Sequence, residues 1–156
     1  MTRAEKIISL FRQKFVQRDD CYPVQYGNNG GGYTVVKAKL TDDVILCHLR
    51  GGKTIGLYGS ADSMTKWLCI DIDDLDEVAV REVQNHIGRF NIPHLTEFSG
   101  KKGYHVWIFF DKPYSNRIAE LWLASSPSIM RFSRSKTALG KASSVIWSRR
   151  LWANTK

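Results

Sequence analysis

The sequence lacks the features of a disulfide scaffold, a zinc protein and a membrane protein. Its 156 residues contain only three cysteines, Cys21, Cys47 and Cys69, which are odd in number and form no Cys-x-x-Cys pair. This pattern favours reduced packing residues over disulfides or zinc ligands. There is no apolar run long enough to span a membrane and no signal-peptide pattern, so we expect a cytoplasmic protein with no membrane partner. With 43% hydrophobic residues, the chain can bury the core of one domain.

Acidic residues are absent from the last part of the chain. Residues 1–120 hold all 15 acids and 16 of the 23 Lys and Arg residues, whereas residues 121–156 hold the other seven basic residues. The net charge of +8 is therefore a property of the tail. The tail is also rich in serine, and its apolar residues follow neither a helical nor a strand period. We expect an organised domain over residues 1–120 and an atypical basic tail over residues 121–156.

The chain is organised around residues 67–74, with the sequence WLCIDIDD. Four apolar residues predict a strand buried on both faces, and the Asp-Ile-Asp that follows restores a period of two. Asp71 and Asp73 therefore leave the same face. Two carboxylates at this spacing can hold a divalent cation or bridge a pair of them, and without a cation they repel each other. The alternative is a strand end that runs into a helix N-cap at Asp74 or Asp76.

Apolar periodicity along the rest of the chain predicts an α/β, or α+β, fold. Thr2 and Glu5 have the spacing of a capping box, which marks the start of a helix. The expected helices span 3–16, 76 to about 90 and a segment from Ser115; the expected strands span 33–40, 44–49, 54–58, 67–72, 94–98 and 104–110. The order from residue 67 is strand, helix, strand, strand, helix. A fourth strand would complete a ferredoxin-like or RRM-like layout, with helices on one face of the sheet.

A basic hairpin forms the second chemical motif. Its residues are Ser99, Gly100, Lys101, Lys102, Gly103 and His105. The glycines allow close approach of the backbone to a ligand, while serine, backbone N–H groups, lysines and histidine can all contact phosphate. The alternative is a tight hairpin with solvated lysines. In the strand that follows, we expect His105, Trp107 and Phe109 on one face, and Val106 and Ile108 on the other.

Taken together, CIDIDD and SGKKGYHVWIFF resemble the first two motifs of the archaeo-eukaryotic primase superfamily, an Asp-x-Asp strand and an SGxxGxH hairpin. Upstream, HLRGGKTIGLY leading into WLCIDID, and FVQRDDCYPVQ followed by GGGY, are similar more narrowly to two groups. These are the primase-polymerase-like domains of TOTE conflict systems and the CRISPR-associated primase-polymerases. The resemblance covers residues 7 to about 121. It implies a primase catalytic core of RRM-like, two-layer type.

The same resemblance implies a DNA primase or polymerase-like nucleotidyltransferase. Asp71 and Asp73 would hold Mg²⁺ or Mn²⁺. The third catalytic residue would be His105, which would contact phosphate rather than act as a general base. The residues implied to bind the nucleoside triphosphate, NTP or dNTP, are Ser99, Gly100, Lys101, Lys102, Gly103, His105 and Arg50. A DNA template and primer would be partners. So would a helicase, a nuclease or CRISPR-system proteins.

The sequence departs from that family after the helix at residue 115. A fourth strand with a third acid, a stretch resembling FPKQD, and GN and PLG elements are all missing. Residues 131–156 can be encoded by several sets of synonymous codons. When such a DNA sequence is read in the frame that starts at the third base of each codon, one permitted translation is IFPKQDSLGKGKFGNLVKAPLGKHQ, which contains the missing elements. We therefore infer a one-base frameshift between about residues 119 and 130. A natural basic tail that binds DNA phosphates is the alternative. With the frameshift, the chain is a partial copy that binds metal and nucleotide weakly and polymerises little.

Two other classes of function remain open. A non-catalytic, RRM-like nucleic-acid-binding module could stack bases on Trp107 and Phe109. A metal-dependent phosphohydrolase or nuclease could use Asp71 and Asp73 for cleavage. Incorporation of a nucleotide, binding alone, or cleavage without incorporation would separate the three classes.

Overall fold

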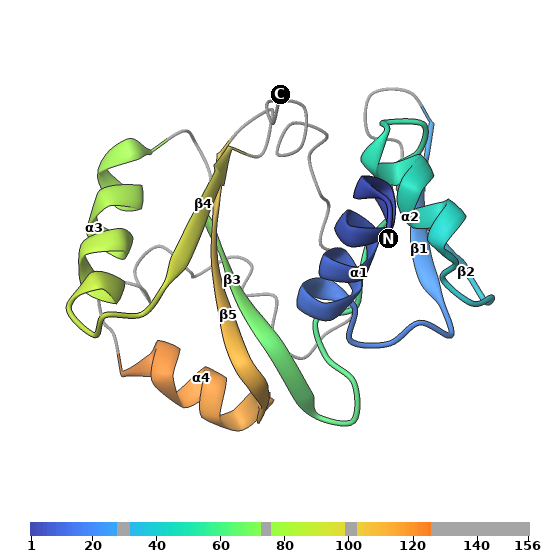
Figure 1. Cartoon of the computed structure of the whole chain (residues 1–156). Helices are drawn as coiled ribbons and strands as arrows, with labels where there is room; N and C mark the ends of the chain where they lie inside the picture. Colours follow the sequence, from blue (N-terminus) through green and yellow to red (C-terminus); the bar gives the residue numbers. More distant parts are fainter. Residues whose placement is uncertain (28–31, 73–75, 99–102, 126–156) are drawn as a thin grey trace.

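The computed structural model describes residues 1–27, 32–72, 76–98 and 103–125 (Figure 1). Helices and antiparallel strands are mixed along the chain, which confirms the expected α+β class. In chain order the elements are α1 (Arg3–Phe15), β1 (Tyr22–Tyr26), β2 (Gly32–Val36), α2 (Asp42–Leu49), β3 (Met64–Ile72), α3 (Glu77–Gly88), β4 (His94–Phe98), β5 (Tyr104–Ser115) and α4 (Asn116–Ala124). Strands β1 and β2 form one sheet, and β3, β4 and β5 form another.

The β3-α3-β4-β5-α4 segment has the element order predicted from residue 67 onward. Its strands lie in the spatial order β3-β5-β4, and α3 and α4 lie on one side of the sheet (Figure 1). Helix α3 begins at the predicted N-cap, where Asp76 Oδ1 accepts a hydrogen bond from the Ala79 N–H at 2.9 Å. Leu68 of β3 and Val106 and Ile108 of β5 form a buried cluster with the apolar side of α3. This cluster is the core of the expected RRM-like unit.

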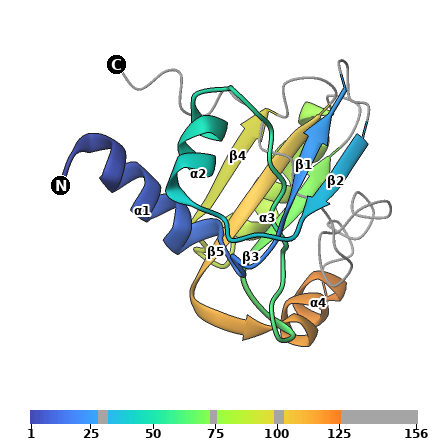
Figure 2. The same ribbon diagram turned by 90° about the vertical axis from the view of Figure 1, so that its right-hand side faces the viewer.

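The opposite face of the sheet is also covered. Figures 1 and 2 show α1, α2 and the β1–β2 pair on this side. Phe11 and Phe15 of α1 form a second buried cluster with Trp67 and Trp107 of the sheet. The first turn of α1 in this layer is stabilised by the predicted capping box, in which Thr2 and Glu5 make both hydrogen bonds.

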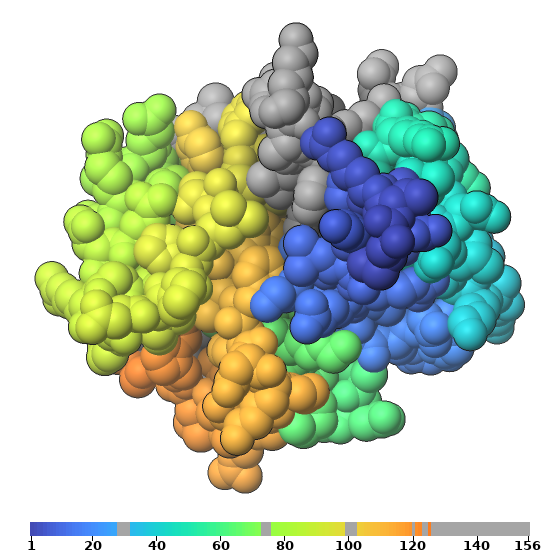
Figure 3. Space-filling model, in the orientation of Figure 1, coloured from blue at the N-terminus to red at the C-terminus, as the bar shows by residue number. Residues whose placement is uncertain are grey.

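The N-terminal layer removes Trp107 from the surface. Its side chain is fully buried, and its ring lies edge-on to Phe15 at 5.7 Å and to Trp67 at 5.3 Å between centroids. Phe109 is half-buried against Phe15, at 4.9 Å. Part of β5 reaches the surface between β4 and α1 (Figure 3). The predicted faces of β5 are confirmed, but the prediction that Trp107 could stack bases is wrong because α1 occupies that side.

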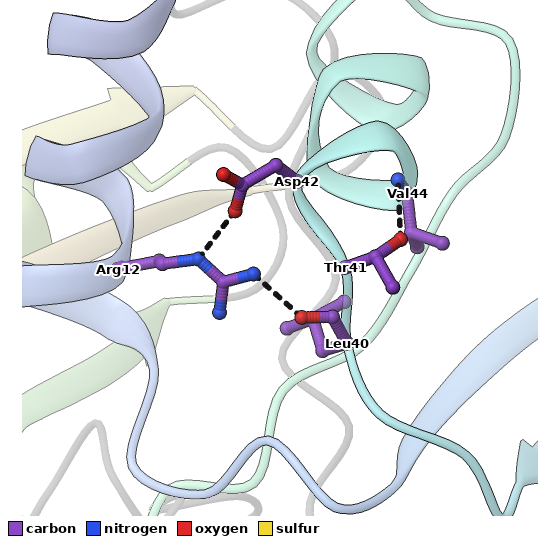
Figure 4. A network of polar contacts seen from close by, with 5 residues as sticks. All are labelled: Arg12, Leu40, Thr41, Asp42 and Val44. Carbon is purple, nitrogen blue, oxygen red and sulfur yellow. Dashed lines mark hydrogen bonds and ion pairs between the residues drawn. The ribbon is translucent and has the colours of Figure 1, made fainter.

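Residues 44–49 were expected as a strand, and this prediction is wrong. They lie in α2, which begins after the N-cap Thr41; the Val44 N–H donates to Thr41 Oγ1 at 3.4 Å (Figure 4). Arg12 of α1 fixes this helix start, because its Nε donates to Asp42 Oδ1 at 2.7 Å and its Nη2 to the Leu40 carbonyl at 2.6 Å. A short, mainly apolar run such as VILCHL fits either a buried strand or a short helix, and the Thr-Asp-Asp before it is an N-cap pattern as well as a turn pattern.

Three further strand predictions differ from the structure. The strand expected over residues 33–40 corresponds to β2, which ends at Val36. Of the segment 54–58, only Ile55 forms a β-bridge, and it pairs with Val24 of β1 instead of running toward the central strand. Strand β5 was expected to end at Phe110, but it continues to Ser115. Its pairing with β3 is interrupted between Phe109 and Tyr114 by a register shift. Pro113 is tolerated within this irregularity because no ladder hydrogen bond requires its missing N–H.

Helix α4 starts at the predicted place. Ser115 Oγ accepts a hydrogen bond from the Ile118 N–H at 3.4 Å, and the helix continues to Ala124. Within the described ranges, β3 and β4 are the edge strands of the three-stranded sheet. The predicted irregular tail lies outside the described residues from position 126 onward. Among the helices that the structure describes, none is long and apolar enough to cross a membrane.

Candidate functional site

One row of side chains crosses the three-stranded sheet near the Ile72 end of β3. Asp71 of β3 pairs with His105 of β5, and His105 pairs with Glu97 of β4. Directly opposed residues of antiparallel strands point to the same face, so the three side chains lie side by side. His105 Nε2 lies 3.6 Å from Asp71 Oδ1, and His105 Nδ1 lies 3.5 Å from Glu97 Oε2. The imidazole therefore lies between two carboxylates.

The pairing follows from the two sequence motifs. Residues 67–70 are buried against both helical layers, and Asp71 is the first acidic residue of that run on the His105 face. The hairpin pairs Phe98 with Tyr104, which places residue 97 opposite residue 105. Asp71 and His105, predicted separately as a metal ligand and a phosphate contact, are thus brought together.

Burial differs along the row. The side chain of Asp71 is 29% exposed, that of His105 14% and that of Glu97 only 2%. Solvent or a ligand can reach Asp71, whereas Glu97 is enclosed by protein. Trp107 is part of that enclosure, since its Nε1–H donates to Glu97 Oε2 at 3.1 Å. A carboxylate of this kind requires such donors, because burying an unpaired charge is costly.

Negative charge at this end of the sheet also affects Cys69, which lies on the same face. Burial raises the pKa of the Cys69 thiol well above its ordinary value, and the charges of Asp71 and Glu97 add to the effect. A thiol in this state stays protonated and is a poor nucleophile and a poor metal ligand. This agrees with the interpretation of Cys69 as a packing residue.

Sequence reasoning did not include Glu97 in the site. The signal was present: a hairpin closed by Phe98 and Tyr104 sets Glu97 opposite His105, and an acid in the middle of a short strand is uncommon without a partner. Asp111, the next acid along the chain, is exposed in the irregular part of β5, beyond Phe109. Of these two acids, only Glu97 contacts His105.

The other predicted site residues divide into two groups. Those outside the described residues are Asp73, Ser99, Gly100, Lys101 and Lys102. Gly103 is described and is buried just before β5. Arg50 is the C-cap of α2 and is exposed; among described residues it makes no ion pair or hydrogen bond with Asp71 or His105. Its expected position at a strand end is wrong, and its role as a nucleotide contact remains a prediction.

His48, which lies near Arg50 in the sequence, is within α2 and is 3% exposed. Its Nδ1–H donates to the carbonyl of Lys53 at 3.2 Å. This histidine therefore serves the packing of the N-terminal layer.

The donor chemistry of the row suits a hard divalent cation only in part. Asp71 supplies a partly exposed carboxylate, the ligand type that Mg²⁺ and Mn²⁺ prefer. Within the described ranges, however, no group of three His, Cys, Asp or Glu side chains is arranged to hold a metal ion. Asp71 thus fits as one ligand of a site that needs further oxygen atoms, and its predicted partner Asp73 lies outside the described residues.

Comparison with known proteins adds a family to this geometry. The family model of the archaeo-eukaryotic primase domain of TOTE conflict systems matches residues 36–130, more than half of the chain. The chain belongs to this family. The matched region contains the whole β3-α3-β4-β5-α4 unit and both sequence motifs. The resemblance inferred from CIDIDD and SGKKGYHVWIFF is thereby confirmed. No curated protein matches the chain.

The residues matched by the TOTE-type primase model include Asp71 and His105. At the level of the family, this domain is a primase-like nucleotidyltransferase. Domains of this family are generally metal-dependent. In addition, α1 and most of the β1–β2 pair precede the matched region, although α1 supplies Phe11 and Phe15 to the core behind the sheet. The folded unit therefore extends beyond the family match at its N-terminal side.

Proposed function

We propose that this primase-family domain binds a nucleoside triphosphate together with Mg²⁺ or Mn²⁺ at the Asp71 end of the sheet. The observation that carries the proposal is the 3.6 Å approach of His105 Nε2 to Asp71 Oδ1 across β3 and β5. A carboxylate can hold the cation and an imidazole can contact a phosphate oxygen, and phosphoryl transfer is catalysed mainly by positioning metal ions and phosphate contacts around the triphosphate.

Each residue has a distinct part in this proposal. Asp71, with Asp73, holds the divalent ion. His105 offers its Nε2 edge to the triphosphate, with Ser99, Gly100, Lys101, Lys102 and Gly103 of the hairpin as further phosphate contacts. The bound ion would neutralise the triphosphate and polarise the reacting phosphorus centre. The protein itself orients the nucleotide, and a DNA template and primer would be the nucleic-acid partner.

The chain is proposed to be a partial copy of the catalytic domain. The family carries a third acid on a strand after α4, whereas residues 121–156 contain no acid. A one-base frameshift between about residues 119 and 130 accounts for this composition. Reading the gene across these codons tests the frameshift directly. Restoring the frame should raise nucleotide incorporation from little or none to a robust level.

Metal-dependent incorporation of a labelled nucleotide tests the proposed chemistry. The full chain and a frame-restored chain would be assayed on a primed DNA template, each with Asp71→Ala and Asp73→Ala variants. Incorporation by the frame-restored chain that both variants abolish is the expected result. Cleavage of DNA or nucleotide without incorporation would instead indicate a phosphohydrolase or nuclease. Robust primer extension by the 156-residue chain would show that its tail is functional and that the frameshift hypothesis is wrong.

A further inference from the structure

The geometry points to Glu97 as a positioning residue that holds the His105 ring with Nε2 directed toward the Asp71 side of the sheet. The first observation is the register: Glu97, His105 and Asp71 are successive members of one cross-strand row. Glu97 Oε2 faces Nδ1 at 3.5 Å, and Asp71 Oδ1 faces Nε2 at 3.6 Å. Each ring nitrogen thus has a different carboxylate neighbour.

The second observation is the rigidity of Glu97. Its side chain is 2% exposed, and the same Oε2 atom that faces His105 also accepts the Trp107 Nε1–H at 3.1 Å. Trp107 is itself fully buried between Phe15 and Trp67, so it cannot move away from the carboxylate. A carboxylate fixed in this way favours the imidazole form that carries a proton on Nδ1.

The contact between Glu97 and Nδ1 determines which nitrogen of the His105 ring faces the exposed side. When Nδ1–H is held by Glu97, Nε2 is the nitrogen that takes up a second proton, and the Nε2–H of the charged ring can then donate to a carboxylate or phosphate oxygen on the open, Asp71 side. Carboxylate groups that orient a functional histidine through its second nitrogen are a recurrent device in proteins. The ring orientation rests on the geometry alone, whereas its use in contacting a triphosphate rests on the function proposed above.

The test combines a spectroscopic measurement on His105 with substitutions of Glu97. Glu97→Leu removes the acceptor at similar volume, while Glu97→Gln keeps an oxygen that can accept from both Nδ1–H and Trp107. Thr96→Val is the matched control, because it removes a hydrogen bond from Gln84 Nε2, 2.8 Å long, to the adjacent residue of β4. This control perturbs the strand without touching the row.

Long-range ¹H–¹⁵N spectra of the ¹⁵N-histidine-labelled full chain report which nitrogen carries the proton. They would be recorded at alkaline pH, where imidazoles are neutral. We expect the Nδ1–H form of His105 in the wild type, Glu97→Gln and Thr96→Val, and a shift toward Nε2–H in Glu97→Leu. A predominant Nε2–H form in the wild type would overturn the proposal even if Glu97→Leu did not fold. An unchanged His105 spectrum in folded Glu97→Leu would overturn it as well.

Binding of a nucleoside triphosphate with Mn²⁺ is the second measurement, by calorimetric titration of the same four proteins. We expect the affinity of Glu97→Leu to fall by about 10-fold, with Glu97→Gln and Thr96→Val close to wild type. If the wild type binds no nucleotide but its His105 is in the Nδ1–H form, the positioning role stands and the proposed function fails. If the tautomer changes in Glu97→Leu while affinity does not, the positioning has no role in nucleotide binding.

Discussion

Replacing Phe15 tests whether the N-terminal layer is an integral part of the fold. Phe15 is 6% exposed and its ring contacts Phe11, Trp107 and Phe109, with centroids 5.5, 5.7 and 4.9 Å away. Truncation of a buried phenylalanine to alanine costs about 3–5 kcal/mol. A domain of this size has a free energy of unfolding of about 5–15 kcal/mol, so Phe15→Ala removes a large share of it.

Urea denaturation followed by tryptophan fluorescence measures this loss. With a slope of about 2 kcal/mol per molar urea, Phe15→Ala should lower the midpoint by about 2 M. The emission should also shift to the red, because Trp107 and Trp67 lose the cover of the α1 ring. Phe15→Leu keeps most of the volume and should cost clearly less, which leaves a measurable variant if Phe15→Ala does not fold.

Leu10 provides the matched control on the same helix, since it is 44% exposed. Leu10→Ala should cost less than about 1 kcal/mol, because surface substitutions have small effects. If Phe15→Ala were no more destabilising than Leu10→Ala, α1 would not cover the sheet. The face of Trp107 would then be open, and stacking of bases on it would again be possible.

Three further predictions concern stability. Arg12→Ala should lower the free energy of unfolding by about 1 kcal/mol, because the guanidinium that joins α1 to Asp42 and to the Leu40 carbonyl is lost. Urea titration measures this loss, and an unchanged midpoint would contradict the role of Arg12. Asp76→Ala should also cost about 1 kcal/mol through loss of the α3 N-cap, with Asp76→Asn close to wild type as the control. Since burial raises the pKa of the Cys69 thiol, the contribution of this thiol to stability should be constant below its ordinary pKa of 9.0 and fall as pH rises above it, because the unfolded thiol ionises first. Cys69→Ala should flatten that decline, and an equally steep decline in the variant would refute the assignment.

Much of the sheet could be predicted from the sequence because its signals are local. The period of two in β5 correctly separated His105 and Trp107 from Val106 and Ile108, and the Asp76 N-cap fixed the start of α3. Residues 44–49 were mistaken for a strand, since a short apolar run does not by itself distinguish strand from helix.

The rest depended on contacts between distant segments. Local pattern does not reveal that α1 packs on the far face of the sheet, so the alternative function placed Trp107 on an open face where bases could stack. Two of the three residues of the row, Asp71 and His105, could be singled out from their local motifs. Glu97 was missed because the expected strands 94–98 and 104–110 were not paired residue by residue, and only that register sets Glu97 against His105.

The most direct test of the central claim is calorimetric titration of a nucleoside triphosphate into the full chain in the presence of Mn²⁺. We expect weak binding that requires the metal and that falls about 10-fold or more in both Asp71→Asn and His105→Ala, a loss of about 1.4 kcal/mol or more. The Arg12→Ala variant, altered far from the row, should bind as the wild type does. Equal affinity in Asp71→Asn, His105→Ala and the wild type would contradict the assignment of this site.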